Sequence, residues 1–109
     1  MTLPDESNRP ENWNWVSVIS VGEPIRLTAV EWNDFCSRIN EFRNYSGLAQ
    51  YSFLAVHQGD KITAAATNQA LSAILEIPGH GDAPAAVSAG DKIYAELFNK
   101  LRDALNAIP

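Results

Sequence analysis

Hydrophobic residues recur at intervals of three and four positions in three stretches of the chain, and each stretch predicts an amphipathic helix. The second helix is expected to start after Thr63 and to end at Pro78-Gly79, because proline cannot continue a helix. The third is expected to start between residues 91 and 95 and to run to the end of the chain. In the first stretch the hydrophobic positions are Ala29, Trp32, Phe35, Ile39 and Phe42.

The first predicted helix has a clear start and a clear end. Thr28 and Glu31 form a capping box, in which the threonine is the N-cap and the glutamate lies three residues inside the helix. Gly47 follows the periodic stretch and is typical of a helix C-terminus. The pattern therefore predicts a helix over about 29–44.

One short pattern leads into each helix. It reads GDKITAAATN from Gly59 and GDKIYAELFN from Gly90, and a diverged copy begins at Val21. A spacing of roughly 31 to 35 residues between copies is typical of a repeated supersecondary unit, so three related loop-helix units are expected. Aligned without gaps, the copies share a valine, an alanine and an asparagine: Val21, Val56 and Val87; Ala29, Ala64 and Ala95; Asn33, Asn68 and Asn99.

The repeated asparagine is unusual, because asparagine is a mediocre helix former and a buried amide needs hydrogen-bond partners. We hypothesise that each amide bonds backbone groups of the Val-x-x-Gly-Asp loop that precedes its own helix, so that Gly59 and Gly90 belong to clamped turns. The alternative is that all three asparagines face solvent. Recurrence within one chain favours a role in packing over a role in catalysis.

The stretches between the predicted helices are rich in β-branched and aromatic residues. Residues 13–21, residues 51–56 and the AAVSA run before Gly90 each resemble a short strand. The predicted fold is therefore mainly α: a three-helix domain built from three related loop-helix units, with two or three short β-strands between helices. A polar N-terminal arm over 1–12 is expected to precede this single domain at 13–109.

Composition narrows the classes of function. The chain has 109 residues, which fits one domain, and its net charge is −5. An acidic chain without a basic stripe is a poor partner for nucleic acid, whose phosphates are neutralised by Lys and Arg. No hydrophobic run is long enough to cross a membrane, and the polar N-terminus does not resemble a signal peptide. We expect neither nucleic acid nor membrane as a partner, and synthesis in a cytoplasm.

No pattern in the chain indicates catalysis or cofactor binding. The only cysteine, Cys36, lies within a helical pattern and reads as a small core residue. His57 and His80 have no spacing typical of a metal site. Asp60 and Asp91 occupy equivalent positions of two copies and read as turn or cap residues. We therefore expect no enzyme, no cofactor, no metal and no small-molecule substrate.

Trp13 and Trp15 are candidate interface residues. On a strand, side chains two positions apart project from the same face. The pair follows the polar arm, and tryptophan is the residue type most enriched in interface hot spots. One interpretation is that the arm and both tryptophans dock on neighbouring subunits. The other is that the tryptophans cover the end of the chain's own core.

Three pieces of the chain, 27–40, 59–74 and 90–106, resemble modules that recur in small virion proteins of tailed bacteriophages. The second piece departs from the module, with Thr67 where an aromatic residue is usual and Ala70 where leucine is usual. The resemblance implies a tail, baseplate, neck or fibre-associated structural subunit located in the virion. It implies other virion proteins or copies of the chain itself as partners, and no catalytic residues. A free cytoplasmic protein-binding or regulatory module is the alternative.

Overall fold

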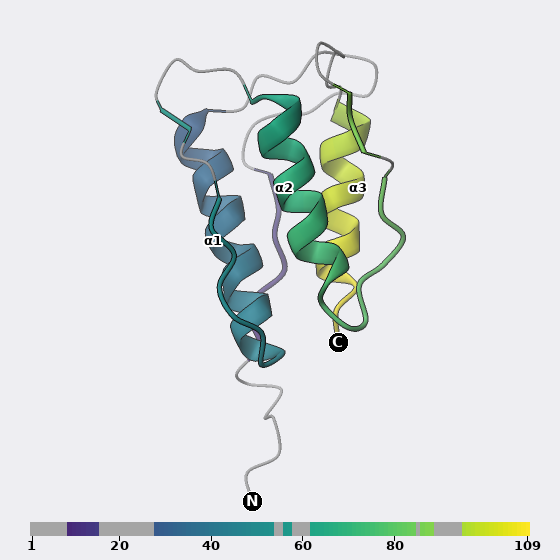
Figure 1. Ribbon diagram of the computed structural model, residues 1–109. Helices are drawn as coiled ribbons and strands as arrows, with labels where there is room; N and C mark the ends of the chain where they lie inside the picture. Colours follow the sequence, from purple (N-terminus) through teal and green to yellow (C-terminus); the bar gives the residue numbers. More distant parts are fainter. Residues whose placement is uncertain (1–8, 16–27, 54–55, 58–61, 85, 89–94) are drawn as a thin grey trace, which may run out of the picture.

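Three α-helices run side by side and in the same direction (Figure 1). They are α1 (Ala29–Tyr45), α2 (Ala64–Leu75) and α3 (Ala95–Asn106), which agrees with the three predicted helices to within a few residues. All three begin at one end of the molecule, and the C-terminus lies at the other end (Figure 1). The computed structural model describes residues 9–15, 28–53, 56–57, 62–84, 86–88 and 95–109.

Parallel neighbours explain the long connections between the helices. A helix of 17 residues such as α1 rises about 25 Å, so the chain must return over that distance before the next parallel helix can start. About eight extended residues cover it. The return after α1 passes alongside that helix, and the return after α2 passes beside α2 and α3 (Figure 1).

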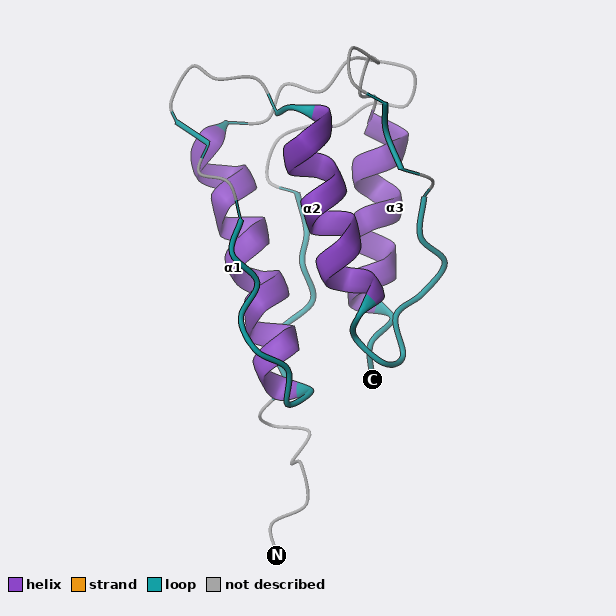
Figure 2. Cartoon of the chain, viewed as in Figure 1, coloured by secondary structure: helices purple, strands orange, loops and turns teal. Residues whose placement is uncertain are grey.

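The returning segments are extended, but the described residues contain no β-strand (Figure 2). The expectation of short strands is therefore not confirmed in the described parts of 51–56 and of the run before Gly90. Of the strand expected at 13–21, the structure describes 13–15, which are also not a strand. The physical reason is that these backbones bond side chains and main-chain groups of the helices instead of a neighbouring strand.

The start of α1 confirms the sequence-based N-cap. The Thr28 hydroxyl accepts a hydrogen bond from the backbone N–H of Glu31 at 3.1 Å. Thr63 caps α2 in the same way, accepting from the N–H of Ala66 at 3.1 Å. After α1, Gly47 has a φ of +83°, a left-handed conformation that glycine adopts at low cost and that turns the chain back along the helix.

The hydrophobic core lies where the three helices meet, and positions that align between the three sequence copies are buried alike. Helix α2 carries small residues at two of these positions, where α1 and α3 carry tryptophan, phenylalanine or leucine. The four aligned sets, all exposed by 2% or less, are Trp32, Thr67 and Phe98; Phe35, Ala70 and Leu101; Ile39, Ile74 and Leu105; and Phe42, Ile77 and Ile108.

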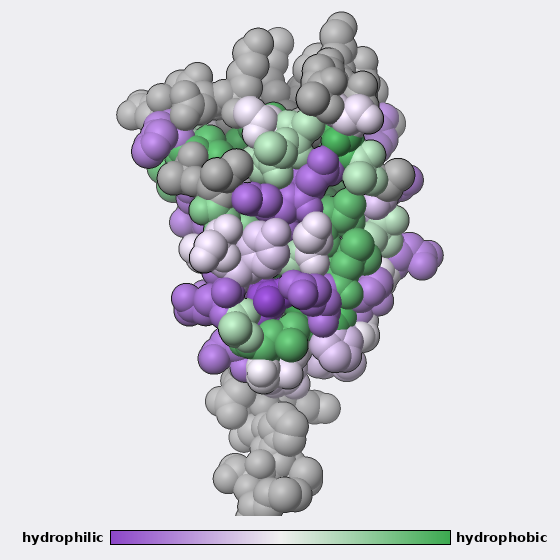
Figure 3. Space-filling view, viewed as in Figure 1, coloured by the Kyte–Doolittle hydropathy of each residue, from purple (hydrophilic) through white to green (hydrophobic). Residues whose placement is uncertain are grey.

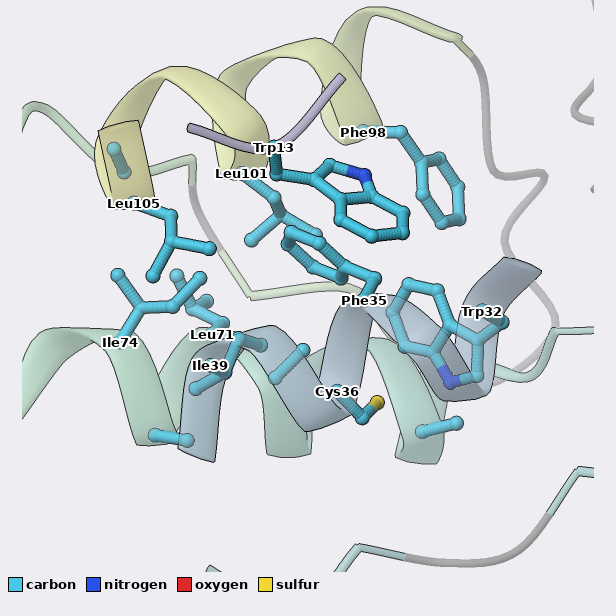
Figure 4. Packing of buried hydrophobic residues seen from close by; sticks show 14 of the residues in the cluster. Trp13, Trp32, Phe35, Cys36, Ile39, Leu71, Ile74, Phe98, Leu101 and Leu105 are labelled. Atoms are coloured by element: carbon cyan, nitrogen blue, oxygen red, sulfur yellow. The ribbon is translucent and has the colours of Figure 1, made fainter. Parts of the chain in front are cut away.

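Five aromatic rings join α1, α3 and the N-terminal residues 13–15, and we name them the aromatic cluster: Trp13, Trp15, Trp32, Phe35 and Phe98. Trp32 of α1 meets Phe98 of α3 edge-on, with ring centroids 5.4 Å apart. Trp13 and Trp15 lie 5.5 and 4.7 Å from the ring of Phe35. Figure 4 shows Trp13 between the ribbon of α3 and the side chain of Phe35. Rings at these distances and angles attract one another beyond the gain from burial alone.

The cluster predicts that Trp13 contributes strongly to stability although it lies near the N-terminus. Trp13→Ala should lower the free energy of unfolding by about 3–5 kcal/mol, because it removes a large buried side chain. Asn14→Ala is the matched control on the same segment, where the side chain is exposed and a change within about 0.5 kcal/mol is expected. Urea denaturation followed by circular dichroism measures both. Equal effects of the two substitutions would contradict the packing described here.

Candidate functional site

The N-terminal residues 9–15 lie on helices α1 and α3 of the same chain, and we name them the docked segment. Trp13 is 9% exposed and belongs to the core. The half-buried Trp15 donates its indole N–H to the backbone carbonyl of Phe98 at 3.1 Å. Within a single chain, both candidate interface tryptophans therefore pack on the chain's own core.

Arginines fix the rest of the docked segment. Arg9 donates from Nε to the carbonyl of Ile108 at 2.8 Å and from Nη2 to the carbonyl of Asn106 at 3.1 Å. It thereby bonds the last carbonyl of α3, which helical hydrogen bonds leave free, and a second carbonyl two residues beyond the helix. Arg38 of α1 donates to the carbonyl of Glu11. Residues 9–12 of the expected arm are thus held by their own chain, and residues 1–8 lie outside the described residues.

The backbone of Trp13 is bonded by a side-chain amide of α3. Its N–H donates to Oδ1 of Asn106 at 2.7 Å, and Nδ2 of Asn106 donates to its carbonyl at 2.9 Å. An asparagine amide carries both an acceptor and a donor, so it offers an extended residue the two bonds that a neighbouring strand would offer. We name this two-way pair an asparagine clamp.

Two more asparagine clamps hold the segments that follow α1 and α2. Asn40 and the backbone of Tyr51 exchange bonds of 2.8 and 3.1 Å. Asn68 and the backbone of Val87 exchange bonds of 2.8 and 2.7 Å. A one-way bond of 2.8 Å runs from Asn33 Nδ2 to the carbonyl of Val56. In the described residues each helix therefore holds an extended segment through at least one clamp.

The partners of the repeated asparagines differ from those that we hypothesised from the sequence. Asn33 and Asn68 bond Val56 and Val87, which lie after their own helices and belong to the next sequence copy. Among the described residues, the partners lie in the segment that returns along the helix it has just left, and most of the two loops hypothesised to provide them lies outside the described residues. Asn99 differs from both, since its Oδ1 accepts a long bond of 3.4 Å from Nη1 of Arg102.

Sequence reasoning missed two clamping residues, Asn40 and Asn106. Each lies seven residues after a repeated asparagine, which is two helical turns along nearly the same face. That regular spacing was a usable signal. In the second copy the aligned residue is Leu75, whose side chain is 47% exposed.

The other repeat positions have mixed placements. Ala29 is buried at 8% exposure and Ala64 is half-buried, which fits small residues at the first turn of a helix. Ala95 is the first residue of α3, and its side chain is outside the description. Gly59 and Gly90 lie outside the described residues, so the proposed turns are not part of the structural account.

A buried arginine, also not anticipated from the sequence, ties α1 to α2. Arg43 is 6% exposed and donates from Nε to the carbonyl of Ala49 at 2.8 Å. Its Nη1 donates to the carbonyl of Ala73 at 3.0 Å and to the carboxylate of Glu76 at 2.9 Å. A buried charge is tolerated only with such partners. Arg43 therefore stabilises the contact between α1 and α2.

The single cysteine is placed as a core residue. Cys36 is 5% exposed, and burial raises the pKa of its thiol from 9.0 to about 12. The thiolate is the nucleophilic form of cysteine, and at neutral pH almost none of it exists with such a pKa. This placement agrees with the interpretation of Cys36 as a packing residue.

The surface shows small hydrophobic areas. On the face drawn in Figure 3, polar side chains cover much of the surface and hydrophobic ones form a narrow strip beside α2. Among the described residues, the large hydrophobic side chains that stand exposed are Val30, at 69%, and Leu75. The large aromatic groups that join one element to another therefore lie inside, in the aromatic cluster.

The described residues form neither a metal site nor a membrane-spanning helix. Within the described ranges, no three His, Cys, Asp or Glu side chains gather in a way that could hold a metal ion. No helix in that part of the chain is both long and apolar enough for a membrane crossing. Comparison with protein families, with curated proteins and with solved structures finds no match. The clamps and the aromatic cluster are therefore the basis for a functional proposal.

Replacement of Asn68 tests whether a clamp acts through both of its bonds. Asn68→Ala should lower the free energy of unfolding by about 1–3 kcal/mol, because it leaves two backbone groups of Val87 without their partner. Asn68→Asp keeps the acceptor but sets a carboxylate oxygen against the Val87 carbonyl, so it should cost at least as much. The exposed Asn44 of α1 is the control, and Asn44→Ala should change little. Chemical denaturation of the three variants decides the matter, and a silent Asn68→Ala would refute the clamp.

The raised pKa of Cys36 predicts a pH dependence of stability. The unfolded chain loses the thiol proton near pH 9, whereas the folded chain keeps it up to about pH 12. The contribution of this thiol to the free energy of unfolding is therefore fully present below pH 9, and it decreases as the pH rises from 9 to 12. Cys36→Ala should flatten this part of the stability profile, measured by urea titration at each pH. An identical slope in both proteins would show that the thiol is not protected by burial.

Proposed function

We propose that the protein is a structural subunit of a bacteriophage virion, associated with the tail, baseplate, neck or fibre, and that it acts through protein–protein contacts. The assignment to a virion is supported by the resemblance of residues 27–40, 59–74 and 90–106 to virion modules. The geometry supports the mode of action, which is the docking of extended segments on helices.

The proposal includes a fold made of three related units. Each unit would consist of a helix and an extended segment that the helix clamps, and the four aligned sets of core residues support this register. Helices α1 and α2 hold the segments that follow them. Helix α3 holds the docked segment, which precedes all three helices in the sequence, through Asn106.

Buried polar side chains of the described residues support a scaffolding role. Arg43 bonds two backbone carbonyls and one carboxylate. The hydroxyl of the buried Thr67 donates to the carbonyl of Thr63 at 2.8 Å. Asn68 bonds both backbone groups of Val87. These groups are engaged in holding the chain together, which is what a rigid building block requires.

One observation carries the proposal: an N-terminal segment is bound by the same kind of clamp that holds the internal segments. Its contacts are hydrogen bonds and aromatic packing between separate elements, and none depends on a covalent connection to those elements. Such contacts work within a chain and between chains alike. A subunit built this way has a ready means of joining its neighbours.

Two measurements test the proposal. Mass spectrometry of purified phage particles should detect the chain when the phage that encodes it is grown. Light scattering after size exclusion should show species larger than the 11.9 kDa chain at high concentration. A strictly monomeric protein that is missing from particles would refute the proposal and favour the free regulatory module.

A further inference from the structure

We propose that the docked segment exchanges between copies, so that residues 9–15 of one chain bind the α1–α3 surface of a second copy. This inference rests on the proposed structural role and names the partner of that role. It assigns the second copy's docked segment as the occupant of a surface made by Arg38, Phe35, Phe98 and Asn106, together with the C-terminal carbonyls of α3.

The docked segment differs from the internal segments in its attachment. The segments clamped at Tyr51 and at Val87 have a helix on both sides in the sequence, so both of their ends are fixed. Among the described residues, the docked segment is followed by a helix and is not preceded by one. It can therefore leave its surface without the unfolding of any described helix, whereas an internal segment stays tied to a helix at both ends.

The connection is long enough to reach a neighbour. Twelve residues separate Trp15 from Thr28, the N-cap of α1. Fully extended, twelve residues span about 40 Å. That distance exceeds the length of α1, which is about 25 Å. A copy packed alongside thus lies within reach of the segment.

The surface selects the chain's own segment over an unrelated peptide. It needs an arginine for the carbonyls of Asn106 and Ile108, and four residues later a tryptophan whose backbone fits the clamp of Asn106. Two positions further on it needs a donor for the carbonyl of Phe98, which the second tryptophan supplies. A second copy of the chain carries this whole pattern, Arg-Pro-Glu-Asn-Trp-Asn-Trp, in the required spacing.

In the closed form the docked segment binds its own chain, and in the exchanged form it binds a second copy. Both forms make the same contacts, so the protein concentration decides which of them prevails. A short linker between two binding elements typically gives an effective concentration on the order of millimolar, and twelve residues join the docked segment to Thr28. Exchange becomes favourable when copies approach that concentration, as they do when packed in an assembly. The protein should therefore be closed when dilute and exchanged when crowded.

Cysteine trapping between full-length chains tests the exchange. One chain carries Glu11→Cys on the docked segment, and a second carries Arg38→Cys on α1, where the guanidinium of Arg38 reaches the backbone carbonyl of Glu11. The two are mixed at about 1 mM, close to the effective concentration of the linker, and then joined by a bis-maleimide crosslinker that spans the length of an arginine side chain. Asp34→Cys, at an exposed position of the same helix, replaces Arg38→Cys in the control mixture. Peptide mapping identifies the joined residues.

We expect the Glu11–Arg38 mixture to give severalfold more interchain crosslink than the control, and this excess to disappear after roughly hundredfold dilution before the crosslinker is added. A chain carrying both cysteines should form the link within itself when dilute. Equal yields from both mixtures at high concentration would overturn the exchange. A doubly substituted chain that never forms the link would overturn it too, because the docking contact itself would be absent.

The outcome for exchange is separable from the outcome for the proposed function. Particles that contain the protein while the trapping shows no excess would refute exchange and leave the structural role standing. Interchain trapping by a protein that particles lack would support exchange and refute the virion role.

Discussion

The bond between an asparagine amide and an extended backbone is the interaction on which the arrangement of this molecule depends. Returning segments run along the helices without a neighbouring strand, so their N–H and C=O groups need other partners. Asn40, Asn68 and Asn106 each supply a donor and an acceptor to one residue of such a segment. Each hydrogen bond contributes modestly to stability, but an unbonded buried group would be costly. The clamps therefore fix where each segment lies.

The parallel helices leave a surface on α1 and α3 that the docked segment covers. In the described part of the chain each helix holds an extended segment, and the one on α3 precedes all three helices in the sequence. The docked segment fills this position and completes the aromatic cluster between Phe35 of α1 and Phe98 of α3. The small residues Thr67 and Ala70 of α2 occupy core positions at which α1 and α3 carry larger side chains. The three helices therefore contribute unequally to the core.

The same construction links stability to the proposed role. In the proposed exchange, a segment that contributes two tryptophans to the core of its own chain would also join one copy to another. A building block with this property can exist closed and then join others without new contacts having to evolve. In the proposed exchange, the docked segment and the α1–α3 surface make the contacts between copies. The acidic side chains elsewhere on the surface take no part in these contacts.

The sequence by itself determined the three helices, the Thr28 cap and the buried positions from Trp32 to Ile108, because these depend on spacing and on neighbours a few residues away. It also singled out Asn33 and Asn68 as structural residues. The path of the returning segments was decided only in the tertiary structure, and with it the partners of those amides and the absence of strands among the described residues. Trp13 and Asn106, 93 residues apart, meet because the helices are parallel. No local pattern encodes that pairing, since it depends on how whole elements pack.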